Sequence, residues 1–199
     1  MSDKNSYPHL RTERLILRFA EDTDIPEIFR YFRENEERFA PTHPRKEADF
    51  YSEVFWRDRI SKAKLDFENG KSVRLIMLSS TSENGIVGTI NLNEIVRGLF
   101  QASYVGYDIS GCYEGQGLMR EGMQRVVEFA FSELNLHRLM ANYQPSNIRS
   151  GNLLKRLGFI VEGTAGAYLF INGDWRDHVL TSLTNYRWKG DCMAESSWE

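Results

Sequence analysis

The spacing of hydrophobic residues alternates between strand and helix periodicity along the chain, and each change predicts an element. Leu15, Leu17 and Phe19 alternate with polar residues and indicate an opening strand over residues 13–19. Helical spacing follows over residues 25–32, directly after candidate N-cap residues at positions 22–24. Residues 47–67 contain neither Gly nor Pro and predict one long helix or two short helices.

The middle of the chain returns to strand periodicity. Residues 72–78 and 86–95 predict two strands joined through Asn84-Gly85, a pair that suits the positive φ angles of a tight hairpin turn. A third strand is expected over residues 102–109, after the polar break around Arg97-Gly98. The simplest arrangement of these segments is three neighbouring antiparallel strands.

A glycine-rich segment, residues 111–117, separates these strands from the most regular helical pattern in the chain. The hydrophobic stripe of that helix consists of Met119, Met123, Val126, Val127, Ala130, Phe131 and Leu134. We then expect a strand over residues 137–143 and a helix that starts at Ser146 or Asn147 and ends at Gly158. Two last strands, residues 159–171 and 175–183, are expected to meet in a turn at Asn172-Gly173.

This order of elements predicts one α/β (α+β) domain over residues 1–199. Its fold is expected to be a mixed, mostly antiparallel sheet of about seven strands, flanked by helices. The core is expected to extend over about residues 11–186, and the polar tail, residues 187–199, is expected to be loose.

Composition narrows the class of protein. With 199 residues, 41% of them hydrophobic and 27% charged, the chain suits one globular domain rather than a disordered or membrane protein. No apolar run approaches the roughly 20 residues that span a bilayer. The polar N-terminal residues do not resemble a secretory signal, so we expect a cytoplasmic protein.

The net charge argues against a nucleic-acid-binding site, and the positions of the Cys and His residues argue against a metal site. A formal net charge of −3 argues against a basic nucleic-acid-binding face. Cys112 and Cys192 are far apart in the sequence and are expected to be reduced thiols rather than a disulfide. His137 and His178 lie on separate predicted strands without a ligand cluster, so no metal site is expected.

The glycine-rich segment has a possible chemical use. Backbone amides exposed at a helix N-terminus bind phosphate oxygens, and Gly115 and Gly117 let the backbone approach an anion closely. Alone, the pattern fits an ordinary turn equally well. The spacing also differs from the dinucleotide-binding pattern Gly-x-Gly-x-x-Gly, and no βαβ unit precedes it.

A second motif decides between these alternatives. Asn147-Ile148-Arg149-Ser150, followed by residues 153–159 ending in Leu-Gly-Phe, resembles the closing motif of the GNAT acetyltransferases. The resemblance implies the GNAT fold, with acetyl-coenzyme A as co-substrate. It implies that amides from Gly115 to Arg120 hold the pyrophosphate, and that the pantetheine arm lies between the strands ending near Ile109 and Asn142. The cofactor contacts expected are Ile109, Gly115, Gln116, Gly117, Leu118, Met119, Arg120, Asn142 and Asn147. For Asn147, a helix N-cap is the alternative role.

The resemblance extends to one group within the family. Four segments, residues 105–107, 115–119, 137–143 and 175–178, look like the Rim group of N-terminal acetyltransferases. This implies transfer to the α-amine of a ribosomal protein, most specifically the N-terminal alanine of the fifth protein of the small subunit. The chain departs from the common pattern at Glu114 and Met119, where Arg or Gln and Gly or Ala are usual. Leu154 occupies the place where many GNAT enzymes have a tyrosine as general acid.

An α-amine needs little base catalysis, because its reference pKa lies near ~7.7 to 8.0. We expect Glu162 or Asp108 to take up the proton of the amine, with a pKa raised by burial, and Ser150 to hydrogen-bond the departing thiolate. Tyr107, Tyr168 and Trp175 are expected to wall the peptide slot. The alternatives are plain surface carboxylates, a helix-capping serine and core aromatics.

Two other functions remain compatible with the sequence. The first is a GNAT acetyltransferase of a small amine, such as an aminoglycoside, a polyamine or an amino acid, since fold does not fix the acceptor. The second is a non-catalytic acyl-coenzyme A-binding or ribosome-associated module, which the absence of the tyrosine acid keeps open.

Overall fold

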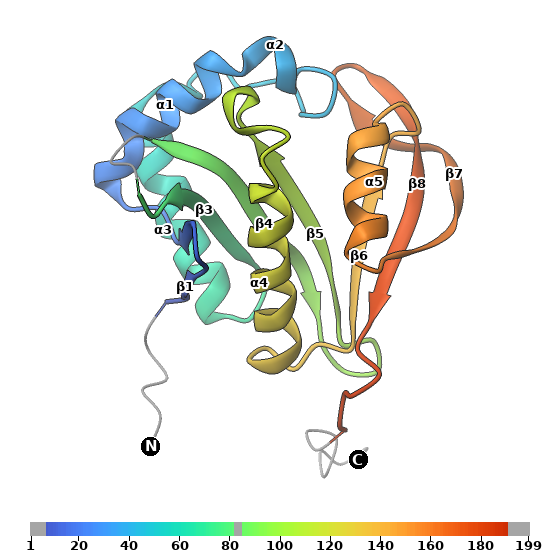
Figure 1. The fold of residues 1–199 in the computed structure, drawn as a ribbon. Helices are drawn as coiled ribbons and strands as arrows, with labels where there is room; N and C mark the ends of the chain where they lie inside the picture. Colours follow the sequence, from blue (N-terminus) through green and yellow to red (C-terminus); the bar gives the residue numbers. More distant parts are fainter. Residues whose placement is uncertain (1–6, 82–84, 191–199) are drawn as a thin grey trace, which may run out of the picture.

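A computed structural model describes residues 7–81 and 85–190 of the chain (Figure 1). The elements in chain order are β1 (His9–Arg11), β2 (Leu15–Arg18), the 3-10 turn η1 (Asp22–Asp24), α1 (Ile25–Glu34), α2 (Glu36–Phe39), α3 (Glu53–Glu68), β3 (Val73–Ser79), β4 (Ile86–Val96), β5 (Ala102–Ile109), the 3-10 turn η2 (Gly111–Tyr113), α4 (Leu118–Ser132), β6 (Arg138–Tyr143), α5 (Ile148–Arg156), β7 (Ile160–Ile171) and β8 (Asp174–Thr184).

These strands form one sheet in the order β1-β2-β3-β4-β5-β6-β8-β7. Every neighbouring pair is antiparallel except β5 and β6, which are parallel. The three antiparallel strands expected over residues 72–109 are therefore confirmed, and so is a mostly antiparallel mixed sheet. The sheet has eight strands instead of seven, because β1, with only Leu10 buried, is too short to show alternation.

Helices cover both faces of the sheet. Figure 1 shows α4 and α5 in front of the sheet and α3 behind it. Gly122 lets α4 lie close to the sheet, since a Cβ there would meet Met77 Sδ at 3.0 Å and Ile90 Cδ1 at 3.1 Å. The main core fills the space between α4 and the sheet. A smaller apolar cluster lies under α1, where Ile28 and Tyr31 pack against β3 and the start of β4.

The predicted helix over residues 47–67 is one helix with a later start. Ser52 caps α3 by accepting a hydrogen bond from the Phe55 amide at 3.2 Å, so the residues before it form turns. At the end of the chain, Asn172 and Gly173 have φ angles of 50° and 87°, which confirms the predicted hairpin turn. Asn84 and the end of the tail lie outside the described residues.

The parallel pair β5 and β6 stays together over only a short length. Three residue pairs connect the strands, from Ala102 with Arg138 to Tyr104 with Met140. Beyond them the strands diverge toward α2 and α5 (Figure 1). The strands that end near Ile109 and Asn142, between which the pantetheine arm is expected, therefore diverge, and the gap lies in the middle of the sheet.

None of the helices in the described part of the chain has the length and apolar character that crossing a bilayer requires.

Candidate active site

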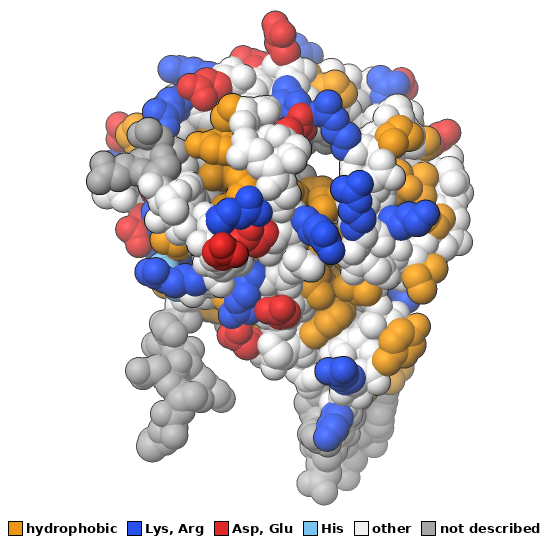
Figure 2. All heavy atoms as spheres, viewed as in Figure 1, with side chains coloured by type: hydrophobic (Ala, Val, Ile, Leu, Met, Phe, Trp, Pro, Cys, Tyr) orange, Lys and Arg blue, Asp and Glu red, His pale blue; other side chains and the backbone are white. Residues whose placement is uncertain are grey.

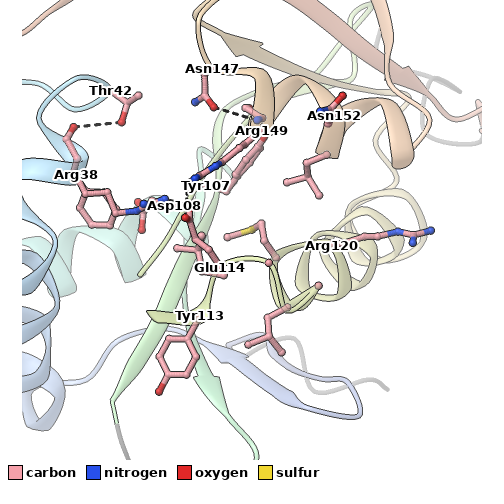
Figure 3. A pocket seen from close by; sticks show the side chains of 18 of the residues that line it. Arg38, Thr42, Tyr107, Asp108, Tyr113, Glu114, Arg120, Asn147, Arg149 and Asn152 are labelled. Atoms are coloured by element: carbon pink, nitrogen blue, oxygen red, sulfur yellow. Dashed lines mark hydrogen bonds and ion pairs between the residues drawn. The ribbon is translucent and has the colours of Figure 1, made fainter. Parts of the chain in front are cut away.

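A cleft of about 950 Å³ opens where β5 and β6 separate. Its walls come from the end of β5, the glycine-rich loop, the start of α4, the first turns of α5, and α2 with the loop after it (Figure 3). It brings together most of the residues predicted from the sequence: Tyr107, Asp108, Ile109, Gly115, Gly117, Leu118, Met119, Arg120, Asn147 and Ser150.

The glycine-rich loop turns the chain into α4 through two left-handed residues. Gly115 has a φ of 71°, and Gly117, the N-cap of α4, has a φ of 79°. Both angles favour glycine strongly. No side chain in the described residues caps α4 at Gly117, so the first amides of the helix are available to an anion at the floor of the cleft.

Basic side chains surround the cleft. Arg38, Arg120, Arg149 and Arg156 all line it. Figure 2 shows Lys and Arg side chains gathered around the hollow between the glycine-rich loop and α5. Although the whole chain is acidic, this opening is electropositive, which suits a phosphorylated ligand.

Glu114 does not expose its charge to that opening. Its carboxylate forms ion pairs with Arg38 of α2 and Arg149 of α5 (Figure 3). Two guanidinium groups on one carboxylate leave a net positive charge at this end of the cleft. The unusual acidic residue in the loop is therefore neutralised by partners that its sequence context does not reveal.

Tyr107 and Ser150 connect the two sides of the cleft. The Tyr107 hydroxyl lies 2.6 Å from Ser150 Oγ, which joins β5 to α5. Burial raises the pKa of Tyr107 to about 12. Asn147 accepts a hydrogen bond from the Ser150 amide at 3.1 Å, so it is the N-cap of α5 as well as a cleft residue. Leu154, where a tyrosine acid is common, is buried in the core.

Asp108 is held on the opposite wall by groups from three other segments. Tyr31 of α1 donates a hydrogen bond to Oδ1, and Thr89 of β4 donates to Oδ2 at 2.9 Å. His43 Nε2, from the loop after α2, lies 3.6 Å from Oδ2. Burial and the neighbouring Asp108 carboxylate raise the pKa of Tyr31, which keeps its hydroxyl a donor.

Glu162 lies outside the cleft lining, and the expectation of a raised pKa is wrong for it. Its carboxylate accepts hydrogen bonds from Arg138 and from Ser182 Oγ, the latter at 2.9 Å. These hydrogen bonds lower its pKa and outweigh a small effect of burial. The cause is its position near the start of β7, which pairs with β8; β8 in turn pairs with β6, whose first residue is Arg138.

Four other predicted residues are also absent from the cleft lining. The Asn142 amide points to the Tyr168 hydroxyl at 3.5 Å, and the Tyr168 ring packs against His178. Trp175 is 59% exposed and packs on Phe170 near the β7–β8 turn. Gln116 instead supports the loop, since its side chain donates to the Cys112 carbonyl at 2.9 Å.

Sequence reasoning missed six residues described here: Arg38, Arg149, Arg156, Tyr31, Thr89 and His43. Arg149 and Arg156 lie inside the recognised motif, residues 147–159, and their position there was a usable signal. The contacts of the others join segments 19 to 77 residues apart, as with Thr89 and Tyr31 on Asp108. Nothing in the local pattern of the chain indicates such pairs.

Known proteins resemble the chain over most of its length. Residues 14–160 match the model of the acetyltransferase (GNAT) domain. The chain is 38% identical over 179 residues to the [ribosomal protein uS5]-alanine N-acetyltransferase of Escherichia coli K12, covering 90% of this chain and 92% of that protein. It is 31% identical to the probable N-acetyltransferase YjcK of Bacillus subtilis, covering 88% and 97%.

Among solved structures, ribosomal-protein-S5-alanine acetyltransferase from Vibrio fischeri superposes with a TM-score of 0.86 at 34% identity, covering 92% of this chain and 99% of that one. Mycobacterium smegmatis RimJ in complex with CoA-disulfide shares the fold, with a TM-score of 0.81 at 21% identity over 96% and 90% of the two chains. The motifs, the divergent parallel strand pair and these matches agree, and the chain belongs to the GNAT family of acetyltransferases.

Proposed function

We propose that this acetyltransferase moves an acetyl group from acetyl-coenzyme A to the α-amine of a protein N-terminus. The acceptor we propose is the N-terminal alanine of the ribosomal protein uS5, the fifth protein of the small subunit. One observation carries the proposal: 38% identity, over nine tenths of the chain, to an Escherichia coli enzyme that bears this activity in its name.

The residues of the cleft fit coenzyme A. The first amides of α4, behind the left-handed Gly117, supply donors for a diphosphate, and the arginines at the rim supply charge. The divergent edges of β5 and β6 supply peptide groups for the amide-bearing pantetheine arm. When bound, acetyl-coenzyme A supplies a thioester whose carbonyl carbon forms the new bond to the amine as the thiol departs.

We assign Asp108 to the acceptor amine. Its carboxylate, held by Tyr31 and Thr89, binds the α-ammonium group and takes up the proton that the nitrogen loses on attack. An α-amine is already partly neutral near pH 7, so orientation matters more than a strong base.

We assign Ser150 as the hydrogen-bond donor to the departing sulfur. Tyr107, with a pKa raised to about 12, holds its proton far more tightly than a thiol, whose reference pKa is about 8.5. Tyr107 is therefore a positioning residue that orients the Ser150 hydroxyl, and it does not itself protonate the thiolate.

The test is acetyl transfer by the purified protein to a peptide that begins with alanine. We expect release of coenzyme A thiol, and one acetyl group on the α-amine by mass spectrometry. The same peptide with a blocked N-terminus should release no coenzyme A thiol, even when its sequence contains an internal lysine. Transfer to spermidine but not to the peptide would show that the acceptor is a small amine.

The assignment of Asp108 is tested separately with Asp108→Asn. We expect this variant to bind acetyl-coenzyme A as the unmodified protein does and to lose roughly 10²-fold in turnover. Asp174→Asn, at the exposed β7–β8 turn, serves as the control and should retain turnover. Full turnover by Asp108→Asn would remove Asp108 from the mechanism.

A further inference from the structure

A second cavity, of about 390 Å³, lies between the sheet and the helices α1 and α3. Its floor and walls are mainly apolar, with Ile28, Phe32, Trp56, Ile60 and Ile76 among the lining residues. Asp108 lines both this cavity and the main cleft, so the two spaces border the same residue. An acceptor whose amine lies at Asp108 therefore has the second cavity beside its next residues.

The strand register fixes how far this cavity extends from Asp108. Asp108 pairs with Thr89, and Thr89 pairs with Ile76, while Arg74 lies two residues before Ile76 on β3. All of these residues line the cavity. Two strand spacings across and two residues along the strand place the Cα atoms of Arg74 and Asp108 roughly 12 Å apart. An extended peptide covers that distance in about three to four residues.

The basic residues of the lining are Arg59 and Lys62 of α3 and Arg74 of β3. Strand register places Arg74 at the end remote from Asp108, and Arg59 and Asp66 are close enough to Arg74 to affect its pKa. Among the residues the structure describes, neither Arg59 nor Arg74 donates a hydrogen bond or has a carboxylate within ion-pair distance. Burial and the nearby Arg59 lower the pKa of Arg74, and Asp66 compensates only in part. Two guanidinium groups that repel each other beside an apolar cavity are a site for a carboxylate.

We infer that the second cavity holds the first residues of the acceptor protein, with the carboxylate of an acidic side chain at its second to fourth position bound by Arg59 and Arg74. This inference rests on the proposed function and adds to it a sequence requirement. Asp108 binds the positively charged amine, and the arginine pair binds the negative side chain. An acceptor segment with these two charges at this spacing matches the cavity at both ends.

The test uses peptides that begin with alanine and carry Glu at position 2, 3, 4 or 5, each matched by the same peptide with Gln or Lys there. At the best of positions 2 to 4, we expect kcat/KM for the Glu peptide to exceed that for the Gln peptide by about tenfold, as for a charge-assisted hydrogen bond. The Lys peptide should fall below the Gln peptide. Added salt should reduce the difference.

The variants Arg59→Gln and Arg74→Gln, alone and combined, identify the source of that preference. The combined variant should reduce the Glu-to-Gln ratio to within about twofold while turnover of the Gln peptide changes little. Arg57→Gln is the matched control, because Arg57 is on α3 but pairs with Asp22 and Glu53 outside the cavity. It should preserve the ratio.

The inference would be overturned if the Glu-to-Gln ratio of kcat/KM were equal in the unmodified protein and the combined variant. It would also be overturned if the unmodified protein preferred the Lys peptide. The same peptide pairs are also compared by calorimetry in the presence of coenzyme A. This measurement gives the Glu-to-Gln ratio of affinities even if no acetyl transfer occurs, so failure of the cavity assignment is distinguished from failure of the proposed function.

Discussion

The hydroxyl groups of Tyr107 and Ser150 show how single residues set the chemistry of this cleft. Their 2.6 Å contact joins β5 to α5 at the place where the strands no longer pair. Leu154, at the place where a tyrosine acid is common, is buried in the core, and the hydroxyl that we propose as the hydrogen-bond donor is that of Ser150. Its orientation depends on a tyrosine that stays protonated throughout the ordinary pH range.

We predict that Tyr107→Phe and Ser150→Ala each lower kcat by about twofold to tenfold, the effect of one net hydrogen bond. Because the two hydroxyls act as a pair, the double variant should lose little more than Ser150→Ala alone. Steady-state kinetics of the four proteins measure this, with acetyl-coenzyme A affinity as the control. Effects that multiply in the double variant would mean that the two residues act independently.

Glu162 illustrates the opposite case, a carboxylate that stabilises the sheet. We predict that Glu162→Gln leaves turnover and its pH profile unchanged. Because the Glu162 side chain is 43% exposed, solvent screens its ion pair with Arg138, and we expect less than about 1 kcal/mol of lost stability. Chemical denaturation and a pH-rate profile test this. A profile altered by the substitution would return Glu162 to the catalytic residues.

At the scale of elements, the glycine-rich loop and α4 form the most sharply defined part of the site. We predict that Gly115→Ala weakens acetyl-coenzyme A binding several-fold by moving the loop backbone. Gly98→Ala is its matched control. Both glycines have left-handed φ angles, 71° and 67°, and neither has another atom within 4 Å of an added Cβ.

The two variants should therefore lose similar stability, about 1 to 2 kcal/mol, from backbone strain. Only Gly115→Ala should lose cofactor affinity, because Gly98 lies in the connection between β4 and β5. Calorimetric titration and thermal unfolding separate the two effects. Equal affinity in both variants would show that the loop does not contact the cofactor.

Elements with a long, regular pattern were predictable, and short ones were not. The stripe from Met119 to Leu134 predicts α4 because a helix of this length repeats its buried face several times. The helix α2 and the strand β1 have four and three residues, too few for a period to be recognised. Packing against the rest of the molecule determines where these two elements form. The local pattern of hydrophobic residues carries no information about that packing.

The residues of the candidate site also fall into two groups, those that the sequence predicts and those that it does not. Residues that belong to contiguous motifs, such as Gly117 and Asn147, were found because one short segment contains both the residue and its context. Tyr31 and His43 were missed because their only link to Asp108 is spatial. Glu162 was placed wrongly because its distance along the sheet from the cleft depends on strand register, which the sequence does not specify.

At the scale of the whole molecule, Arg18 and Asp24 tie the sheet to the layer of helices. Arg18 of β2 donates two hydrogen bonds to the Asp24 carboxylate, at 2.7 and 2.8 Å, just before α1. The Glu21 amide adds a third, at 2.7 Å. Burial acts to raise the pKa of Asp24, but these hydrogen bonds outweigh it, and the pKa is lowered.

We predict that Asp24→Asn lowers the free energy of unfolding at pH 7 by about 1 to 3 kcal/mol, since a partly buried Arg18 loses its partner. A lowered carboxylate pKa contributes stability above the unfolded value, about 3.9, and that stability is lost as pH falls through the folded value. The difference between the two proteins should therefore narrow below about pH 4.

Denaturant unfolding at several pH values measures this difference. Asp22→Asn is the control, because Asp22 is 53% exposed and its ion pair with Arg57, at 3.6 Å, is at the surface. We expect it to change stability by less than about 0.5 kcal/mol at every pH. A constant difference for Asp24→Asn from neutral to acidic pH would contradict the assignment.

Because β5 and β6 pair over only three residues, the middle of the sheet contains main-chain groups without a neighbouring strand. Main-chain amides on the facing edges of residues 105–109 and 141–143 have no strand opposite them. We expect the peptide-like groups of coenzyme A to take the place of the missing strand and to protect these amides from exchange with solvent. We expect deuterium uptake at these two segments to slow when coenzyme A is added, while uptake at the β1–β2 edge stays the same.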